Sequence, residues 1–194
     1  MEDGLVKNYK SKEFGNYDVY VKTVDDIKIL YTKKDFDSVE KVIECLNNMP
    51  EQTKSNLKEI ELLPKKSRGN VAGVTNYDKI TLYGLSKYDE STIENIVYHE
   101  VAHTWAYELI REKILDFSYS TYRDVVEEDD NFVSNYSKKA IKKSSDYSED
   151  FAESVAFYLM DTERFESKYT ARAEFLNSIL ETTSLFLISK YSLY

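Results

Sequence analysis

The chain has 194 residues, 42% of them hydrophobic and 14% aromatic, which is enough for one domain with a sizeable core and too little for two full domains. The net charge of -9 argues against a nucleic-acid-binding protein, because phosphate contacts need a basic surface. The single cysteine, Cys45, excludes an internal disulfide, and the helical apolar pattern around it predicts a buried core thiol.

The first residues, Met1 to Tyr9, contain no apolar signal-peptide core, and no apolar run is long enough to span a membrane. We therefore expect no membrane span. A cytoplasmic protein and a secreted protein whose signal peptide has been removed both fit this composition. We expect a polar, flexible leader at residues 1–16 and a single domain at residues 17–194 that is monomeric.

Up to about residue 112 the chain alternates between strand-like and helical patterns. We first expect a hairpin of residues 17–23 and 27–31, and then a helix from Asp35 or Asp37 to about Asn48. A helical turn after Pro50, a strand at 59–63 and a basic loop at 65–70 follow. A second hairpin of residues 71–75 and 80–83 leads to a central helix, which begins near residues 89–91 and runs through Ile110.

From residue 113 to residue 194 the patterns are mainly helical. We expect one or two short helices within residues 116–143, a strong helix from Ser145 or Ser148 to about Leu159, and a last helix from Thr170 towards Leu187. The acidic run at residues 127–130 is interpreted as a solvated surface or loop rather than a metal site. The order of elements predicts an α+β fold, with a small mixed or antiparallel sheet packed on the central helix and a mainly helical C-terminal half.

The central helix carries the motif His99-Glu100-Val101-Ala102-His103, which contains the only two histidines of the chain. Positions four apart share one face of a helix, so both imidazoles can reach one metal ion. The pattern is typical of a zinc site in which Glu100 acts as general base on a metal-activated water. If the motif has no function, it is a surface helix that carries two incidental histidines.

A catalytic zinc ion takes three protein ligands and keeps one position for water. With both histidines used, we expect the third ligand to be a carboxylate from another helix. Glu149 and Glu153 stand at i and i+4 beside an apolar helix face. We assign Glu149 as the ligand, and Glu153 as the acceptor of a hydrogen bond from the far nitrogen of a ligand histidine. Asp150 and Asp146 are the local alternatives as third ligand. If the segment has no function, Glu149 and Glu153 are two solvated charges on the helix surface.

Together, the segments 99–103 and 147–154 resemble the zinc peptidases built like the catalytic domain of anthrax lethal factor and the bacterial Pro-Pro endopeptidases. Residues 168–176 are similar to the closing helix of that family, and the resemblance covers roughly residues 70 to 185. In the family, the first Glu of a Glu-x-Phe-Ala-Glu helix is the third ligand, which is Glu149 here. The resemblance implies a zincin-like fold and a zinc metalloendopeptidase that hydrolyses an extended peptide or protein without a covalent intermediate.

The chain departs from the family at one position. The family has a catalytic tyrosine seven residues before the ligand glutamate, where this chain has Lys142. Tyr136 and Tyr147 are the candidates to stabilise the oxyanion of the tetrahedral intermediate in its place, and the zinc ion itself is the alternative.

Two other functions are compatible with these motifs. One is an intracellular regulatory peptidase that cleaves a repressor in a mobile genetic element, and the other is a catalytically inactive binding module on the same scaffold. Glu100 argues against the inactive module, because a purely structural zinc site needs no general base. The hairpin before the central helix is expected to place an exposed sheet edge beside the metal, where an extended peptide adds as a strand.

Overall fold

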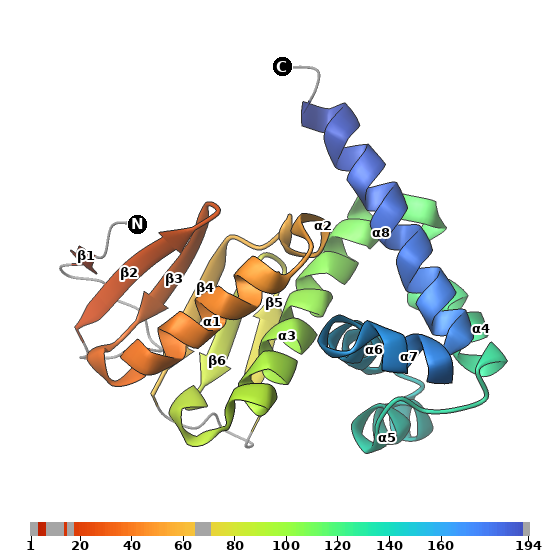
Figure 1. The fold of residues 1–194 in the computed structure, drawn as a ribbon, viewed down its shortest axis with the longest axis horizontal. Helices are drawn as coiled ribbons and strands as arrows, with labels where there is room; N and C mark the ends of the chain where they lie inside the picture. Colours follow the sequence, from red (N-terminus) through yellow and green to blue (C-terminus); the bar gives the residue numbers. More distant parts are fainter. Residues whose placement is uncertain (1–3, 7–13, 15–17, 65–70, 192–194) are drawn as a thin grey trace.

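The structure is a computed structural model that describes residues 4–6, 14, 18–64 and 71–191. Within these residues the strands are β1 (Gly4–Val6), β2 (Val19–Val24), β3 (Ile27–Tyr31), β4 (Glu59–Leu63), β5 (Gly73–Asn76) and β6 (Lys79–Tyr83). The α-helices are α1 (Phe36–Asn48), α2 (Glu51–Lys54), α3 (Glu90–Arg111), α4 (Tyr119–Glu128), α5 (Asn135–Ser144), α6 (Ser148–Met160), α7 (Thr162–Lys168) and α8 (Thr170–Tyr191). The expected α+β class, with a small mixed sheet and a mainly helical C-terminal half, is confirmed (Figure 1).

The sheet has the strand order β1-β2-β3-β4-β6-β5 in the described part of the chain. The β2–β3 hairpin turns through Asp25 and Asp26, both with positive φ, as two-residue hairpin turns that match the strand twist require. Strands β3, β4 and β6 run parallel, and β5 pairs antiparallel with β6 at the edge. Among the described strands, the second hairpin therefore puts β5, rather than β6, at the edge of the sheet.

Two elements differ from the expectations. Within the segment expected to be a leader, Gly4–Val6 forms β1 and pairs with Val19–Val21 of β2. The short helix α7 separates α6 from α8, and the side chain of Asp161 caps its first turn by accepting a hydrogen bond from the amide of Arg164. The basic loop expected at residues 65–70 lies outside the described residues.

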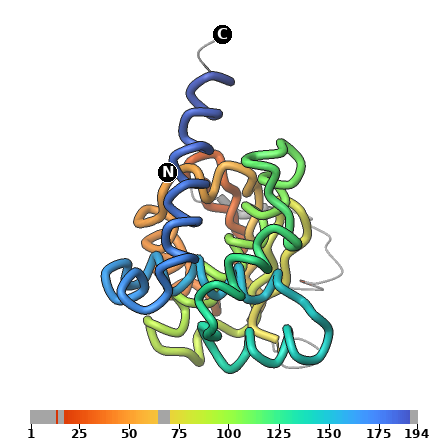
Figure 2. The backbone as a smooth tube through the Cα atoms, turned by 90° about the vertical axis from the view of Figure 1, so that its right-hand side faces the viewer, coloured from red at the N-terminus to blue at the C-terminus, as the bar shows by residue number. Residues whose placement is uncertain are grey.

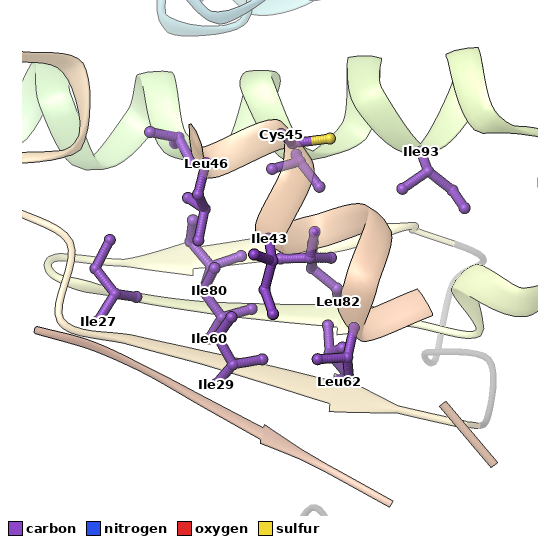
Figure 3. Packing of buried hydrophobic residues seen from close by; sticks show 14 of the residues in the cluster. Ile27, Ile29, Ile43, Cys45, Leu46, Ile60, Leu62, Ile80, Leu82 and Ile93 are labelled. Carbon is purple, nitrogen blue, oxygen red and sulfur yellow. The ribbon is translucent and has the colours of Figure 1, made fainter. Parts of the chain in front are cut away.

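The first hydrophobic core lies between the sheet and the helices α1 and α3. Apolar side chains of the parallel strands point towards α1, and those of α1 fill the space up to α3, as Figure 3 shows. Ile29, Ile60 and Ile80, one from each parallel strand, are almost completely buried. Cys45 lies in this core, as expected, and burial raises the pKa of its thiol to about 12, so that it stays a neutral apolar side chain.

A second core joins the far side of α3 to the C-terminal helices. Trp105 of α3 and Phe151 of α6 lie within it with ring centroids 6.0 Å apart, and Phe151 also contacts Tyr122 of α4. The last turns of α8 extend beyond the other helices (Figures 1 and 2). None of the described helices combines the length and the apolar character that crossing a bilayer requires.

Arg172 of α8 is fully buried and holds three helices together. Its guanidinium donates to both carboxylate oxygens of Asp150 on α6, at 3.0 and 3.3 Å, and to Asp129 at the end of α4, at 2.8 Å. The hydroxyl of Tyr122 lies 3.1 Å from Asp150. The acidic run at residues 127–130 was expected to be a solvated surface or loop. Asp129 does lie in the turn after α4, but it is not solvated: its side chain is 5% exposed, pairs with Arg172 and accepts hydrogen bonds from the first amides of α8.

We expect Arg172→Ala to lower the free energy of unfolding by about 3–5 kcal/mol, because it leaves the buried Asp150 without a compensating charge. The matched control is Arg123→Ala on α4, whose ion pairs with Asp124 and Glu127 are exposed and contribute about 1 kcal/mol or less. Urea denaturation followed by circular dichroism measures both. Equal losses in the two variants would contradict the structural role of the Arg172 network.

Candidate metal centre

The two histidines lie in the middle of α3, between the two hydrophobic cores. Val97 and Val101 of the same helix face the first core, and Ala102 and Ala106 face the second. This arrangement leaves a narrow strip of α3 for polar side chains. On that strip, the ring centroids of His99 and His103 lie 4.9 Å apart, with their Nε2 atoms separated by 3.2 Å.

Glu149 joins the histidines from the first turn of α6. Its Oε2 atom lies 3.2 Å from Nε2 of His99 and 3.7 Å from Nε2 of His103. One ligand atom from each of the three residues lies within 4.8 Å of the other two. The Oε2 atom is buried, and its contacts to the imidazoles lack hydrogen-bond geometry. A buried oxygen that faces two imidazole nitrogens without a hydrogen bond suits a shared cation.

The electrostatics of the cluster agree with this geometry. Burial alone lowers the pKa of His99, but Glu149 and Glu153 outweigh it and raise that pKa to about 9. Burial alone raises the pKa of Glu149, but the imidazoles of His103 and His99 outweigh it and hold that pKa well below its ordinary range. The carboxylates thus need a positive charge next to them, which either a proton or a bound metal ion supplies.

Glu153 lies one helical turn after Glu149 and contacts the other nitrogen of the first histidine. Its Oε1 atom is 3.1 Å from Nδ1 of His99. A carboxylate at Nδ1 keeps the proton there and leaves Nε2 free as a metal ligand. The structure therefore places Glu153 where the role we assigned to it requires.

Glu100 points away from α6, towards the edge strand β5. The hydroxyl of Thr75 lies 2.7 Å from Oε2 of Glu100 and 3.0 Å from its backbone oxygen. Two residues earlier on β5, a Cβ atom on Gly73 would come within 2.5 Å of Cγ and Oε1 of Glu100. The edge strand therefore cradles this carboxylate, and any larger residue at position 73 would displace it.

A cavity of about 390 Å³ opens beside the cluster. The edge strand forms one wall, and the starts of α4, α5 and α6 form the wall opposite. The lining residues are Val71, Gly73, Val74, Thr75, His99, Glu100, His103, Tyr107, Tyr119, Tyr136, Ser148 and Glu149. The histidines, Glu100 and Glu149 thus share one cavity large enough for a segment of peptide.

The two candidate tyrosines lie in different places. Tyr136 of α5 lines the cavity, and its ring centroid is 6.0 Å from that of His99. Burial and the nearby Glu149 raise the pKa of Tyr136 to about 12, so its hydroxyl keeps its proton and can donate. Tyr147 packs against the second core and is not among the residues that line the cavity.

The two aspartates considered as alternative ligands have other roles. Asp150 belongs to the Arg172 network described above. Asp146 accepts a hydrogen bond from the amide of Ser148 at 3.0 Å and another from its hydroxyl, at the start of α6. Neither contributes an atom to the metal-binding group.

Seven of the residues that line the cavity were not expected as site residues from the sequence: Val71, Gly73, Val74, Thr75, Tyr107, Tyr119 and Ser148. Tyr107 stands four positions after His103, so continuing the helical spacing of the motif would have found it. Tyr119, Thr75 and Gly73 come from other elements, and no local pattern marks them. Only the packing of β5 against α3 and of α4 against α8 brings them to the cavity.

In comparisons with known proteins, no family model matches the chain, and no curated protein or solved structure is significantly similar to it. Function is therefore inferred from the chemistry of the site.

Proposed function

We propose that this protein is a zinc-dependent endopeptidase with a zincin-like arrangement of its site. The observation that carries the proposal is the convergence of His99, His103 and Glu149 beside a cavity that also receives the carboxylate of Glu100. Two imidazoles and one carboxylate are a donor set typical of catalytic zinc, whereas calcium and magnesium prefer oxygen ligands alone. Three ligands leave the fourth position of a tetrahedral ion for water or substrate.

Zinc held by these three residues would supply a Lewis acid that polarises the scissile carbonyl and lowers the pKa of a bound water towards neutrality. The protein residues around it have distinct tasks. Glu153 orients His99, and Glu100 accepts the proton of the attacking water and passes it to the leaving amine. Peptide hydrolysis then needs no covalent intermediate with the protein.

The cavity walls supply the remaining functions. Tyr136 offers a protonated hydroxyl to stabilise the oxyanion of the tetrahedral intermediate. The edge strand β5 supplies backbone groups to which an extended peptide pairs as an added strand. This placement supports Tyr136 over Tyr147 as the substitute for the family tyrosine that is missing at Lys142.

The first prediction concerns the metal itself. We expect one zinc ion per chain in the wild-type protein, and its loss or strong weakening in His103→Ala and Glu149→Ala, because each variant removes one of three ligands. Elemental analysis of dialysed protein measures this. Glu163→Ala, an exposed position on α7, is the matched control and keeps its zinc. A wild-type protein that takes up no zinc would contradict the proposal.

The second prediction separates binding from chemistry. Glu100→Gln removes the general base while every ligand stays in place, so we expect normal zinc content and a fall in cleavage of at least roughly 100-fold. Mass spectrometry of a peptide library incubated with the wild type and the variant measures the cleavage. Unchanged turnover by Glu100→Gln would rule out the assigned role.

The third prediction tests whether β5 positions the base. We expect Thr75→Val, which deletes the hydroxyl but keeps the shape, to lower kcat roughly tenfold without changing zinc content or KM. Thr75→Ser restores a hydroxyl and is expected to recover most of the rate. If Val and Ser are equivalent at this position, the hydroxyl does not position Glu100.

A further inference from the structure

We infer that one side of α5 binds acidic residues of the peptide substrate. This side, called the lysine face below, consists of Lys138, Lys139, Lys142 and Lys143. The inference rests on the proposed function and names the class of substrate. It concerns side chains outside the metal-binding group, on a helix that borders the same cavity.

The four lysines form one continuous surface. Their spacing of three and four residues puts them on one side of α5, where they line a shallow groove together with Asn135. All four are exposed. The groove is thus walled by ammonium groups and their aliphatic stems, a surface that suits a flexible chain carrying carboxylates.

Within the described part of the chain, no ion pair compensates the charges of this face. The chain as a whole carries a net charge of -9, yet none of the four ammonium groups has a carboxylate within 4.0 Å among the residues that the structure describes. Lys138 and Lys142, like Lys139 and Lys143, are like charges four apart on a helix, an arrangement that destabilises the helix slightly.

Local interactions account for only part of the lysine face. Lys142 and Lys143 lie in the last turn of α5, where positive charge favours the helix end. Lys138 lies 5.8 Å from the ring centroid of Phe132. Neither explanation covers Lys139. An anionic partner would compensate all four charges at once.

The position of α5 connects this face to the cavity. Tyr136, three residues before Lys139 and seven before Lys143, lines the cavity from the wall opposite β5. A peptide paired with β5 advances about 3.3 Å per residue, so its residues a few positions from the scissile bond lie outside the cavity, where α5 continues from Tyr136 to the lysine face. Next to the metal-binding group, Glu100 and Glu149 repel acidic side chains. We therefore expect the acidic residues of the substrate at positions removed from the scissile bond.

The test measures binding without cleavage. Zinc-loaded Glu100→Gln protein is titrated with three fluorescently labelled peptide pools that share a random four-residue core, flanked on both sides by three Glu, three Gln or three Lys residues. Fluorescence anisotropy is the readout. We expect the Glu-flanked pool to bind most tightly, with a Kd that rises with salt because the contacts are exposed charge pairs.

Two sets of substitutions, made in the Glu100→Gln protein, locate the binding surface. Replacing all four lysines of the lysine face by Gln is expected to weaken binding of the Glu-flanked pool roughly tenfold and to leave the Gln-flanked pool unaffected. The matched control replaces Lys28, Lys33, Lys58 and Lys87, which are exposed elsewhere, by Gln and removes the same charge. Equal binding of the Glu and Gln pools, or equal losses in both variants, would overturn the inference.

The outcome also distinguishes this inference from the proposed function. If the wild-type protein cleaves peptides but shows no preference for the Glu pool, the lysine face is not a substrate site and the peptidase assignment stands. If the Glu pool binds through the lysine face but no peptide is cleaved, the acidic partner is established and the peptidase assignment falls. Binding of a 20-base-pair DNA duplex as tightly as the Glu pool would overturn the assignment to acidic peptide.

Discussion

The burial of charged groups between α3 and α6 is the constraint on which the site depends. His99 and His103 from one helix meet Glu149 and Glu153 from the other, and these side chains compensate one another over distances of 3.1 to 3.7 Å. Removing one of these side chains leaves a buried charge without its partner, which strongly destabilises the folded state. Both helices carry small buried side chains, Ala102 and Ala106 on α3 and Ala152 and Ala156 on α6, which suit the extensive contact between the two helices. Close packing and electrostatic compensation therefore support each other at the same place.

The rotation of α6 about its axis is set by its opposite side. Asp150 follows Glu149 directly in sequence, yet it points to the buried Arg172 of α8 and to Tyr122 of α4. With Asp150 held there, Glu149 and Glu153 face α3. The network around Arg172 thus acts at a distance on the candidate metal centre, because it decides which of two adjacent carboxylates faces the histidines. Buried ion pairs often add little to the free energy of unfolding compared with apolar residues of the same size. Here the ion pairs of Arg172 also orient α6.

The cavity beside the candidate metal centre has two different walls. The edge strand β5 carries Gly73 and Thr75 against Glu100, while α5 brings Tyr136 to the opposite wall of the cavity. The first wall has backbone groups that suit an extended chain, and the second has a protonated hydroxyl followed by the lysine face. Under the proposed function the two walls have different roles. The edge strand aligns the peptide and positions the general base Glu100, and α5 selects the charge of the peptide residues that flank the scissile bond.

The secondary structure and most of the candidate metal centre could be predicted from the sequence, because local sequence patterns determine local structure. The hydrophobic periodicities predicted both hairpins and all the long helices, and the spacings of His99 with His103 and of Glu149 with Glu153 placed each pair on one helix face. Tertiary structure alone decided the rest. The pairing of β1, the burial of Asp129 and the distinction between Asp150 and Glu149 follow from contacts between segments far apart in the chain. Likewise, Thr75 and Gly73 reach the cavity only because β5 packs against α3, and Tyr119 reaches it because α4 packs against α8. Periodicity specifies which side of an element is buried, but the partner that it meets depends on how the whole chain packs.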